Sequence, residues 1–325
     1  MPVVRKLCAC IVLAVAWTLP QQPGPVPAGP PPVELPFDRV KPDATFDLAA
    51  VSRIDAAADR VWTLSVPASS LVAIEPGTNV TGAPVALGGS PCGGMAADFG
   101  AVWVPLCGDR RLARVDVKTF AVTHSALAGL SAPAGSTTAG VGSIWVLADE
   151  RGTLLRIDPD NGAAVADVSV PRGSAAVAFG MKAVWVAAPA AGQVVRINAY
   201  TNLIDKTVAA GQSPRAIAVG DGAIWVLNEG DGTVVRLDPA TNRTAATIDV
   251  GRASAGGWIA AGEGSVWVSA RGAPLVRIDP RTNRVAQRFA GEAGGPLAVG
   301  HRSLWIAVSD AAVWRVDPRF VAALR

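Results

Sequence analysis

Several short segments of this sequence bring acidic and amide side chains close together along the chain. Asn228, Glu229 and Asp231 fall within four residues, and Asp149 is followed directly by Glu150. Carboxylate and amide oxygens are the ligands that Ca²⁺ and Mg²⁺ prefer. Basic residues in neighbouring segments instead favour anions. The residue types therefore allow either a cation site or a site for a small polar or anionic ligand.

Motifs for catalysis are absent from the sequence. It contains two histidines: His124 falls in an expected outer strand and His301 in an expected turn, so neither is placed to act as a general base. No serine-centred elbow, phosphate-binding loop or zinc-ligand spacing occurs. We therefore predict no catalytic residues, no bound metal and no cofactor.

Two of the four cysteines, Cys92 and Cys107, flank an expected hairpin made by GMAADF and AVWVPL. Its turn lies near Gly100, so the two cysteines are roughly opposite each other. In an oxidising compartment they are expected to form a disulfide. A metal pair is less favoured because no histidine is near, and a nucleophilic cysteine would lack a base.

The N-terminus has the pattern of an export signal. Arg5 and Lys6 precede the apolar segment LCACIVLAVAWTL, which is shorter than the roughly 20 residues of a membrane-spanning helix. Small residues suit cleavage after Ala16 or Ala28. We predict a signal peptide over 1–28, a Pro-rich extended linker over 29–43 and a secreted or periplasmic domain over 44–325, tethered if the signal is not cleaved.

The charge balance argues against a nucleic-acid partner. The formal net charge of the 325-residue chain is +3, too small for the basic surface that phosphate-backbone binding needs. Half of the residues are hydrophobic, so a large core is available. No later segment is long and apolar enough to span a bilayer. We expect a monomer whose partner is a small polar ligand or an envelope protein.

The dominant feature of the sequence is an internal repeat of about 40 residues. An apolar residue, Trp and usually Val recur seven times, and an Arg usually followed by Asp-Pro or a similar turn comes ten or eleven residues after six of these tryptophans. The seven tryptophans are Trp62, Trp103, Trp145, Trp185, Trp225, Trp267 and Trp305.

Each repeat contains four short runs rich in Val, Ile and Ala, separated by turn residues. In one repeat these runs are AIAVG, AIWVLN, TVVRLD and TAATIDV, with the turn DPATN before the last. Seven four-stranded repeats predict an all-β fold, a seven-bladed β-propeller. The last repeat ends too early for a fourth strand, so we expect Ala44–Ala50, which matches other fourth strands, to complete the last blade.

The segments PRAIAVG, IWV and DPATN, Pro214 to Asn242, resemble the YVTN-type propeller repeat. This repeat occurs in exported seven-bladed proteins similar to YncE, and distant relatives include the streptogramin (virginiamycin B) lyases. The resemblance covers about 44–325 and implies the fold, whereas proteins with this repeat differ in activity. The lyases use a histidine with a glutamate and magnesium at the channel mouth, and this sequence has no matching histidine.

A residue that recurs in every blade serves the scaffold, whereas a functional site should break the repeat. The tryptophans and the arginines of the third strands are therefore interpreted as packing between blades. Residues that break the repeat gather in loops at one end of the central channel. They are Arg53, Asp55, Asp109, Arg110, Arg111, Asp149, Glu150, Arg215, Asn228, Glu229, Asp231, Trp258 and Arg271.

Two function classes follow from these features. We favour a ligand- or protein-binding or scaffolding module at the cell envelope. The alternative is a lyase or lactonase that holds Ca²⁺ or Mg²⁺ at the channel mouth, with Asp55, Glu150 and Glu229 as the best available acids.

Overall fold

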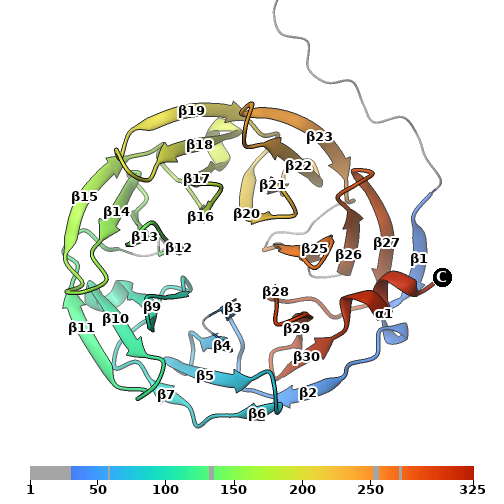
Figure 1. Ribbon diagram of the computed structural model, residues 1–325, viewed down its shortest axis with the longest axis horizontal. Helices are drawn as coiled ribbons and strands as arrows, with labels where there is room; N and C mark the ends of the chain where they lie inside the picture. The colour runs from blue at the N-terminus through green and yellow to red at the C-terminus, as the bar shows by residue number, and fades with distance from the viewer. Residues whose placement is uncertain (1–30, 58, 132–134, 252–255, 271–272) are drawn as a thin grey trace, which may run out of the picture.

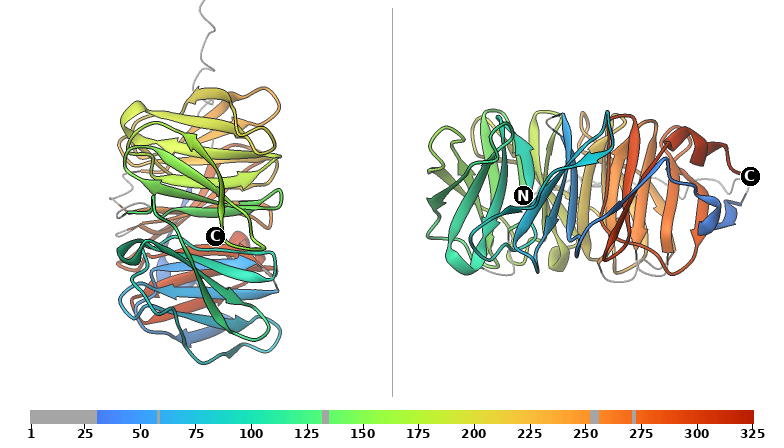
Figure 2. Two further views of the ribbon diagram at one scale, coloured as in Figure 1. Left: turned by 90° about the vertical axis from the view of Figure 1, so that its left-hand side faces the viewer. Right: turned by 90° about the horizontal axis from the view of Figure 1, so that it is seen from below.

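The computed structural model describes residues 31–325 except 58, 132–134, 252–255 and 271–272. Seven sheets are arranged in a ring around a central axis (Figure 1). The side views show this ring edge-on, with the sheets side by side in a single layer (Figure 2). Consecutive antiparallel strands run from the channel to the rim of each sheet. The seven-bladed β-propeller predicted from the repeat is therefore confirmed.

The strands of each blade occupy equivalent places from the channel outwards, and the blade of Trp62 is blade one. The inner strands are β3 (Arg53–Ala57), β8 (Ala96–Asp98), β12 (Thr137–Gly140), β16 (Ala176–Gly180), β20 (Pro214–Gly220), β24 (Trp258–Gly262) and β28 (Leu297–Gly300). The second strands are β4 (Arg60–Ser65), β9 (Ala101–Leu106), β13 (Ser143–Asp149), β17 (Ala183–Ala188), β21 (Ala223–Asn228), β25 (Ser265–Ala270) and β29 (Ser303–Ser309). The third strands are β5 (Ser70–Glu75), β10 (Arg111–Asp116), β14 (Thr153–Ile157), β18 (Gln193–Asn198), β22 (Thr233–Asp238), β26 (Ala273–Asp279) and β30 (Ala312–Val316). The outer strands are β6 (Val80–Thr81) with β7 (Val85–Ala86), β11 (Val122–Ala126), β15 (Ala164–Ser169), β19 (Ile204–Ala209), β23 (Arg243–Asp249), β27 (Arg284–Ala290) and β2 (Ala44–Asp47).

The seven repeated tryptophans lie in the second strands, and each is fully buried. In five blades the indole N–H also donates to the backbone carbonyl five residues earlier, as from Trp225 to Gly220 at 3.0 Å. The ring therefore fills the space between two blades and holds the turn before its own strand. This confirms that the tryptophans are packing residues.

Five of the repeated arginines in the third strands lie over these tryptophans. The Arg236 guanidinium carbon is 5.3 Å from the Trp225 ring centroid, and the same guanidinium donates to the Pro280 carbonyl at 3.0 Å and to Asn283 Oδ1 at 2.7 Å in the next blade. Arg156 reaches Asn202 in the same way, and Arg315 reaches Asn79. In these three cases the arginine joins neighbouring blades through the turn between the third and outer strands.

The ring is closed by the N-terminal strand, as predicted. Strand β2 pairs antiparallel with β30, with Phe46 opposite Val313, so residues from both ends of the chain form blade seven. The Phe46 ring lies 5.7 Å from the Trp305 ring, centroid to centroid. The chain then ends in a short helix, α1 (Pro318–Ala323), instead of a fourth strand of its own.

The segment expected to be an extended linker departs from that prediction. Residues Val33–Pro36 form β1, which pairs in parallel with β27 as a fifth strand of blade six, and Phe37–Arg39 form the short helix η1. Phe37 stacks on Trp314 with ring centroids 5.5 Å apart. The prolines suggested a solvated tether, but alternating apolar residues bury one face, and an edge strand tolerates proline.

Two further findings concern the N-terminal predictions. Within the described part of the chain, no helix has the length and apolar character needed to cross a membrane. The expected signal peptide, 1–28, lies outside the described residues.

Candidate functional site

A cavity of about 380 Å³ opens at one end of the central channel. This volume is near the lower end of the range for small-molecule sites, roughly 300–1,000 Å³. All seven blades contribute to its wall through the residue nine positions before the repeated tryptophan, which we call the opening position. The opening residues are Arg53, Gly94, Ser136, Ala176, Ala216, Trp258 and Pro296.

Arg53 is the charged member of this ring. Its guanidinium is crowded by protein atoms, and burial lowers the pKa of this group while the nearby charge of Asp55 opposes the change. Among the described residues, no hydrogen bond or ion pair within 4 Å engages the guanidinium. Arg53 therefore brings a cationic group, without a direct partner in this part of the chain, to the cavity wall.

Asp55 lies two residues after Arg53 in β3 and is not among the residues that line the cavity. Its Oδ2 accepts from the Ala97 N–H of the neighbouring inner strand β8 at 3.2 Å. Burial raises the pKa of this carboxyl group, and Arg53 and the backbone hydrogen bonds partly offset that effect. In blade three the hydroxyl groups of Ser136 and Thr138 accept from blade four in the same manner, so Asp55 joins two blades.

The charged loop of blade two holds the segment that leads into the inner strand of the same blade, β8. Asp109 Oδ2 accepts from the Ser90 N–H at 2.6 Å, and Arg111 donates to the Gly88 carbonyl at 3.0 Å. Arg110 takes a left-handed conformation with φ of 52° at the end of the short helix η2 (Cys107–Asp109). None of the three residues Asp109, Arg110 and Arg111 lines the cavity.

In blade three, Asp149 and Glu150 both line the cavity but differ in their surroundings. Asp149 is buried and accepts from Arg151 Nε at 3.0 Å and from the Thr153 N–H at 3.0 Å. Burial alone would raise the pKa of Asp149, but these hydrogen bonds outweigh it and lower the pKa. Glu150 is exposed, and no described side chain pairs with its carboxylate.

In blade five, Arg215 lines the cavity and Glu229 stands behind it. Arg215 Nε is 3.4 Å from Glu229 Oε2, while Glu229 Oε1 accepts from the Gly256 and Gly257 N–H groups at 2.8 and 3.3 Å. Glu229 thus neutralises Arg215 and holds the backbone of Gly256 and Gly257, directly before β24. The charge of Arg215 is already compensated.

The other two polar residues of this loop lie outside the cavity lining. Asn228 is fully buried and donates to the Ala210 carbonyl and to Thr233 Oγ1. Asp231 accepts from the Gln212 N–H at 3.0 Å and from Thr233 Oγ1 at 2.7 Å. Both residues thus hold the loop that leads from β19 to β20.

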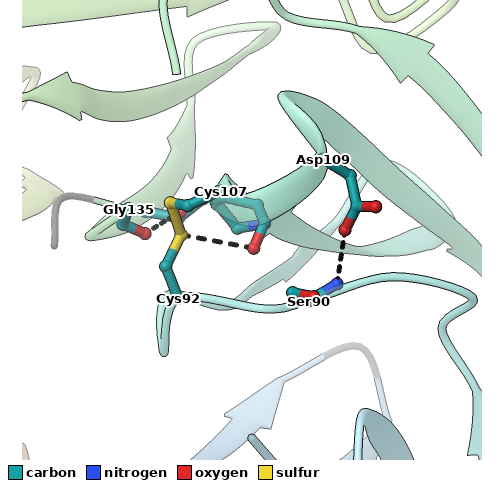
Figure 3. Close-up of a disulfide and its surroundings, with 7 residues drawn as sticks. Ser90, Cys92, Cys107, Asp109 and Gly135 are labelled. Atoms are coloured by element: carbon teal, nitrogen blue, oxygen red, sulfur yellow. Dashed lines mark hydrogen bonds between the residues drawn. A yellow bond between two sulfur atoms is a disulfide. The ribbon is translucent and has the colours of Figure 1, made fainter. Parts of the chain in front are cut away.

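Cys92 and Cys107 form the predicted disulfide, with Cα atoms 5.5 Å apart, beside the cavity (Figure 3). Cys92 also leads into Gly93 and Gly94, which line the wall at blade two. A Cβ on Gly94 would lie 1.5 Å from the Gly135 carbonyl oxygen. The disulfide therefore anchors a wall segment in which only glycine fits against the next blade.

Trp258 completes the lining on the side of blade six and is half-buried. Its ring adjoins the apolar cluster that contains Leu297. Arg271, also expected at the mouth, lies outside the described residues. Sequence reasoning missed the backbone wall of the cavity, which includes Gly173 and Ser174; their glycine-rich loops were the available signal.

Both histidines lie away from the cavity. His124 Nε2 is 2.7 Å from the Leu87 carbonyl oxygen at the rim, and His301 Nε2 is 3.2 Å from the Arg60 carbonyl oxygen. In the residues that the structure describes, no three histidine, cysteine, aspartate or glutamate side chains converge in a group that could hold a metal ion.

Fold and site together define a seven-bladed β-propeller with a polar cavity at one mouth of its channel. Its fold resembles streptogramin B lyase, at 18% identity over 84% of this chain and 96% of that one, with a TM-score of 0.71. It equally resembles a catalytically inactive histidine-to-alanine variant of virginiamycin B lyase from Staphylococcus aureus with quinupristin, at 16% identity over 84% and 98% of the chains and a TM-score of 0.71. BamB from Moraxella catarrhalis is similar at 12% identity over 86% and 99%, with a TM-score of 0.61.

These similarities establish the fold. No family model matches the chain, and no curated protein matches it. The resemblance to the YVTN-type repeat consequently rests on the residues of the repeat itself.

Proposed function

We propose that this protein is an exported binding module that takes a small anionic ligand into the cavity at the channel mouth. The observation that carries the proposal is the state of Arg53, whose guanidinium lines the cavity without a direct partner among the described residues. A charge held in such surroundings is costly unless a counter-charge or water compensates it. A carboxylate or a similar anion would supply that compensation.

The other charges of the mouth support this choice of ligand. Arg151 lies 2.9 Å from Asp149, and Glu229 lies 3.4 Å from Arg215, so both of these pairs are neutral. The carboxyl group of Asp55 accepts from the Ala97 N–H of blade two, and it acts on Arg53 through its charge without forming an ion pair within 4 Å among the described contacts. Within the described part of the mouth, Arg53 is thus the cation that is left for a ligand.

Export is the second part of the proposal. It is supported by the charged and apolar N-terminal segment before the Pro-rich stretch and by the disulfide between Cys92 and Cys107, since disulfides persist in oxidising compartments.

The test is calorimetric titration of the purified protein with acetate, benzoate, citrate and inorganic phosphate at constant ionic strength. We expect at least one of these anions to bind and Arg53→Gln to weaken its binding by tenfold or more, about 1.4 kcal/mol. Arg243→Gln, at an exposed position of the outer strand β23, is the matched control and should bind as the wild type does. Failure of all four anions, or equal binding by Arg53→Gln, would overturn the proposal.

A further inference from the structure

We infer that the ligand of this cavity is a short zwitterionic peptide with an aromatic side chain, an inference that rests on the proposed anion site. Three residues that break the repeat define the three parts of such a ligand. They are Arg53, Glu150 and Trp258, which all line one cavity and carry a guanidinium, a carboxylate and an aromatic ring.

The carboxylate of Glu150 is a second charge without a direct partner among the described side chains. The adjacent Arg151 is committed to Asp149, since both its Nε and Nη2 atoms contact that carboxylate. The backbone of Glu150 is fixed, because its carbonyl accepts from the Gly173 N–H at 2.8 Å. The backbone of Glu150 is therefore held at the cavity wall, and its exposed carboxylate is available to a cationic group.

Arg53 and Glu150 stand on blades one and three, with blade two between them. Among the described ion pairs, none joins these two residues within 4 Å. The wall of blade two between them is formed by Gly93 and Gly94 next to the disulfide, so it offers backbone and no charge. This arrangement keeps the cation and the anion apart, as two ends of one ligand require.

The third element is apolar and lies on the other side of the mouth. Trp258 occupies the opening position of blade six, where five of the other blades have Gly, Ser, Ala or Pro. Pro296 and Leu297 of blade seven continue this apolar surface. A planar ring of the ligand could stack on the indole of Trp258 while its termini face the two charges.

A dipeptide matches this pattern in chemistry. Its ammonium and carboxylate groups are separated by a peptide unit, and an aromatic side chain provides the ring. A single carboxylate would use Arg53 alone, and a divalent cation would use Glu150 alone. A ligand that carries both signs can engage both charges.

Four probes separate these contributions: Ala-Phe, N-acetyl-Ala-Phe, Ala-Phe amide and Ala-Ala. Binding is measured by calorimetry and by the change in tryptophan fluorescence. We expect Ala-Phe to bind most tightly, and each of the other three probes, which lack the ammonium, the carboxylate or the ring, to bind at least tenfold more weakly.

Two variants assign the effect to residues. Glu150→Gln should weaken Ala-Phe tenfold or more and leave N-acetyl-Ala-Phe unchanged, because that probe has no ammonium group. Trp258→Leu should weaken Ala-Phe and leave Ala-Ala unchanged, with the melting temperature measured to verify folding. Glu263→Gln, an exposed acid in the turn between β24 and β25, is the matched control for Glu150→Gln and should change the binding of neither probe.

The outcomes distinguish this inference from the proposed function. If N-acetyl-Ala-Phe binds as tightly as Ala-Phe and Glu150→Gln changes nothing, the zwitterion inference is wrong while the anion site stands. If no probe with a free carboxylate binds, and the simple anions also fail, both are wrong. Equal binding of Ala-Ala and Ala-Phe would remove the aromatic part of the ligand.

Discussion

The space between blades and the mouth of the channel are built from the same seven repeats but follow different rules. Between blades, Trp and Arg recur with the same contacts: Trp225 and Arg236 in blade five match Trp305 and Arg315 in blade seven. At the mouth, equivalent positions hold residues as different as Arg53, Gly94 and Trp258. Repetition therefore marks residues that stabilise the ring, and its loss marks where a ligand can be recognised.

The largest effect is expected from a repeated residue. Trp225→Ala would leave a large space between two blades, and substitutions of this kind cost about 3–5 kcal/mol. We expect a correspondingly lower free energy of unfolding in urea. Trp258→Leu, at the mouth, removes a ring that is only half-buried and should cost much less. Equal losses for the two variants would show that the mouth is as much a part of the scaffold as the space between blades.

An intermediate loss of stability is expected from the repeated arginines. Arg236 reaches the next blade, whereas Arg196, at the equivalent position, does not do so among the described residues. Arg236→Met removes the hydrogen bonds to Pro280 and Asn283 in the next blade and should cost about 1–3 kcal/mol. Arg196 pairs instead with Asp205 of its own blade. Asn242, at the turn equivalent to that of Asn283, has a buried Oδ1 with no partner among the described residues.

Arg196→Met should therefore cost less than Arg236→Met, because it removes a partly exposed ion pair worth up to about 1 kcal/mol. The comparison uses urea unfolding of both variants under one condition. We expect the junction between blades four and five, which lacks this arginine contact among the described residues, to be weaker than the junction between blades five and six. A larger loss for Arg196→Met than for Arg236→Met would mean that the contact of Arg236 with the next blade adds little stability.

Much of the fold follows from the sequence because each blade repeats the same pattern of strands, turns and buried tryptophan. The tryptophan spacing predicts the blades, and the match of 44–50 to other fourth strands predicts the closing strand β2. Strand β1 escaped prediction because it belongs to no repeat and is rich in proline. Its alternating apolar residues form a strand because β27 provides a sheet edge for pairing, and this edge exists only in the folded protein.

The site is predicted less completely. Alignment on the tryptophans identifies the opening positions that line the cavity, including Arg53 and Trp258. It also selects Asn228, Asp109 and Asp231, which lie outside the cavity lining and instead bond to the loop that leads into the inner strand of their blade. A departure from the repeat shows that a residue has a particular task, but tertiary contacts decide whether that task is structural.

The last prediction concerns Asp55, which breaks the repeat, lies next to the cavity and also joins two blades. Burial raises the pKa of its carboxyl group in the folded state, so the folded protein holds this proton to a higher pH than the unfolded chain does. Stability should therefore fall as the pH rises from about 4, the pKa of an unfolded aspartate, through the raised pKa of the folded state. The loss is complete above that value.

Asp55→Asn would remove this dependence while an amide oxygen could still accept from the Ala97 N–H. We expect the wild type to lose stability relative to Asp55→Asn across this pH window, by about 1.4 kcal/mol for each unit of pKa difference. Urea unfolding at several pH values from 4 upwards measures the difference. A difference that grows in the opposite direction would mean that Arg53 holds Asp55 ionised. The charge of Arg53 would then be compensated from within the protein, and the mouth would offer no free cation to an anionic ligand.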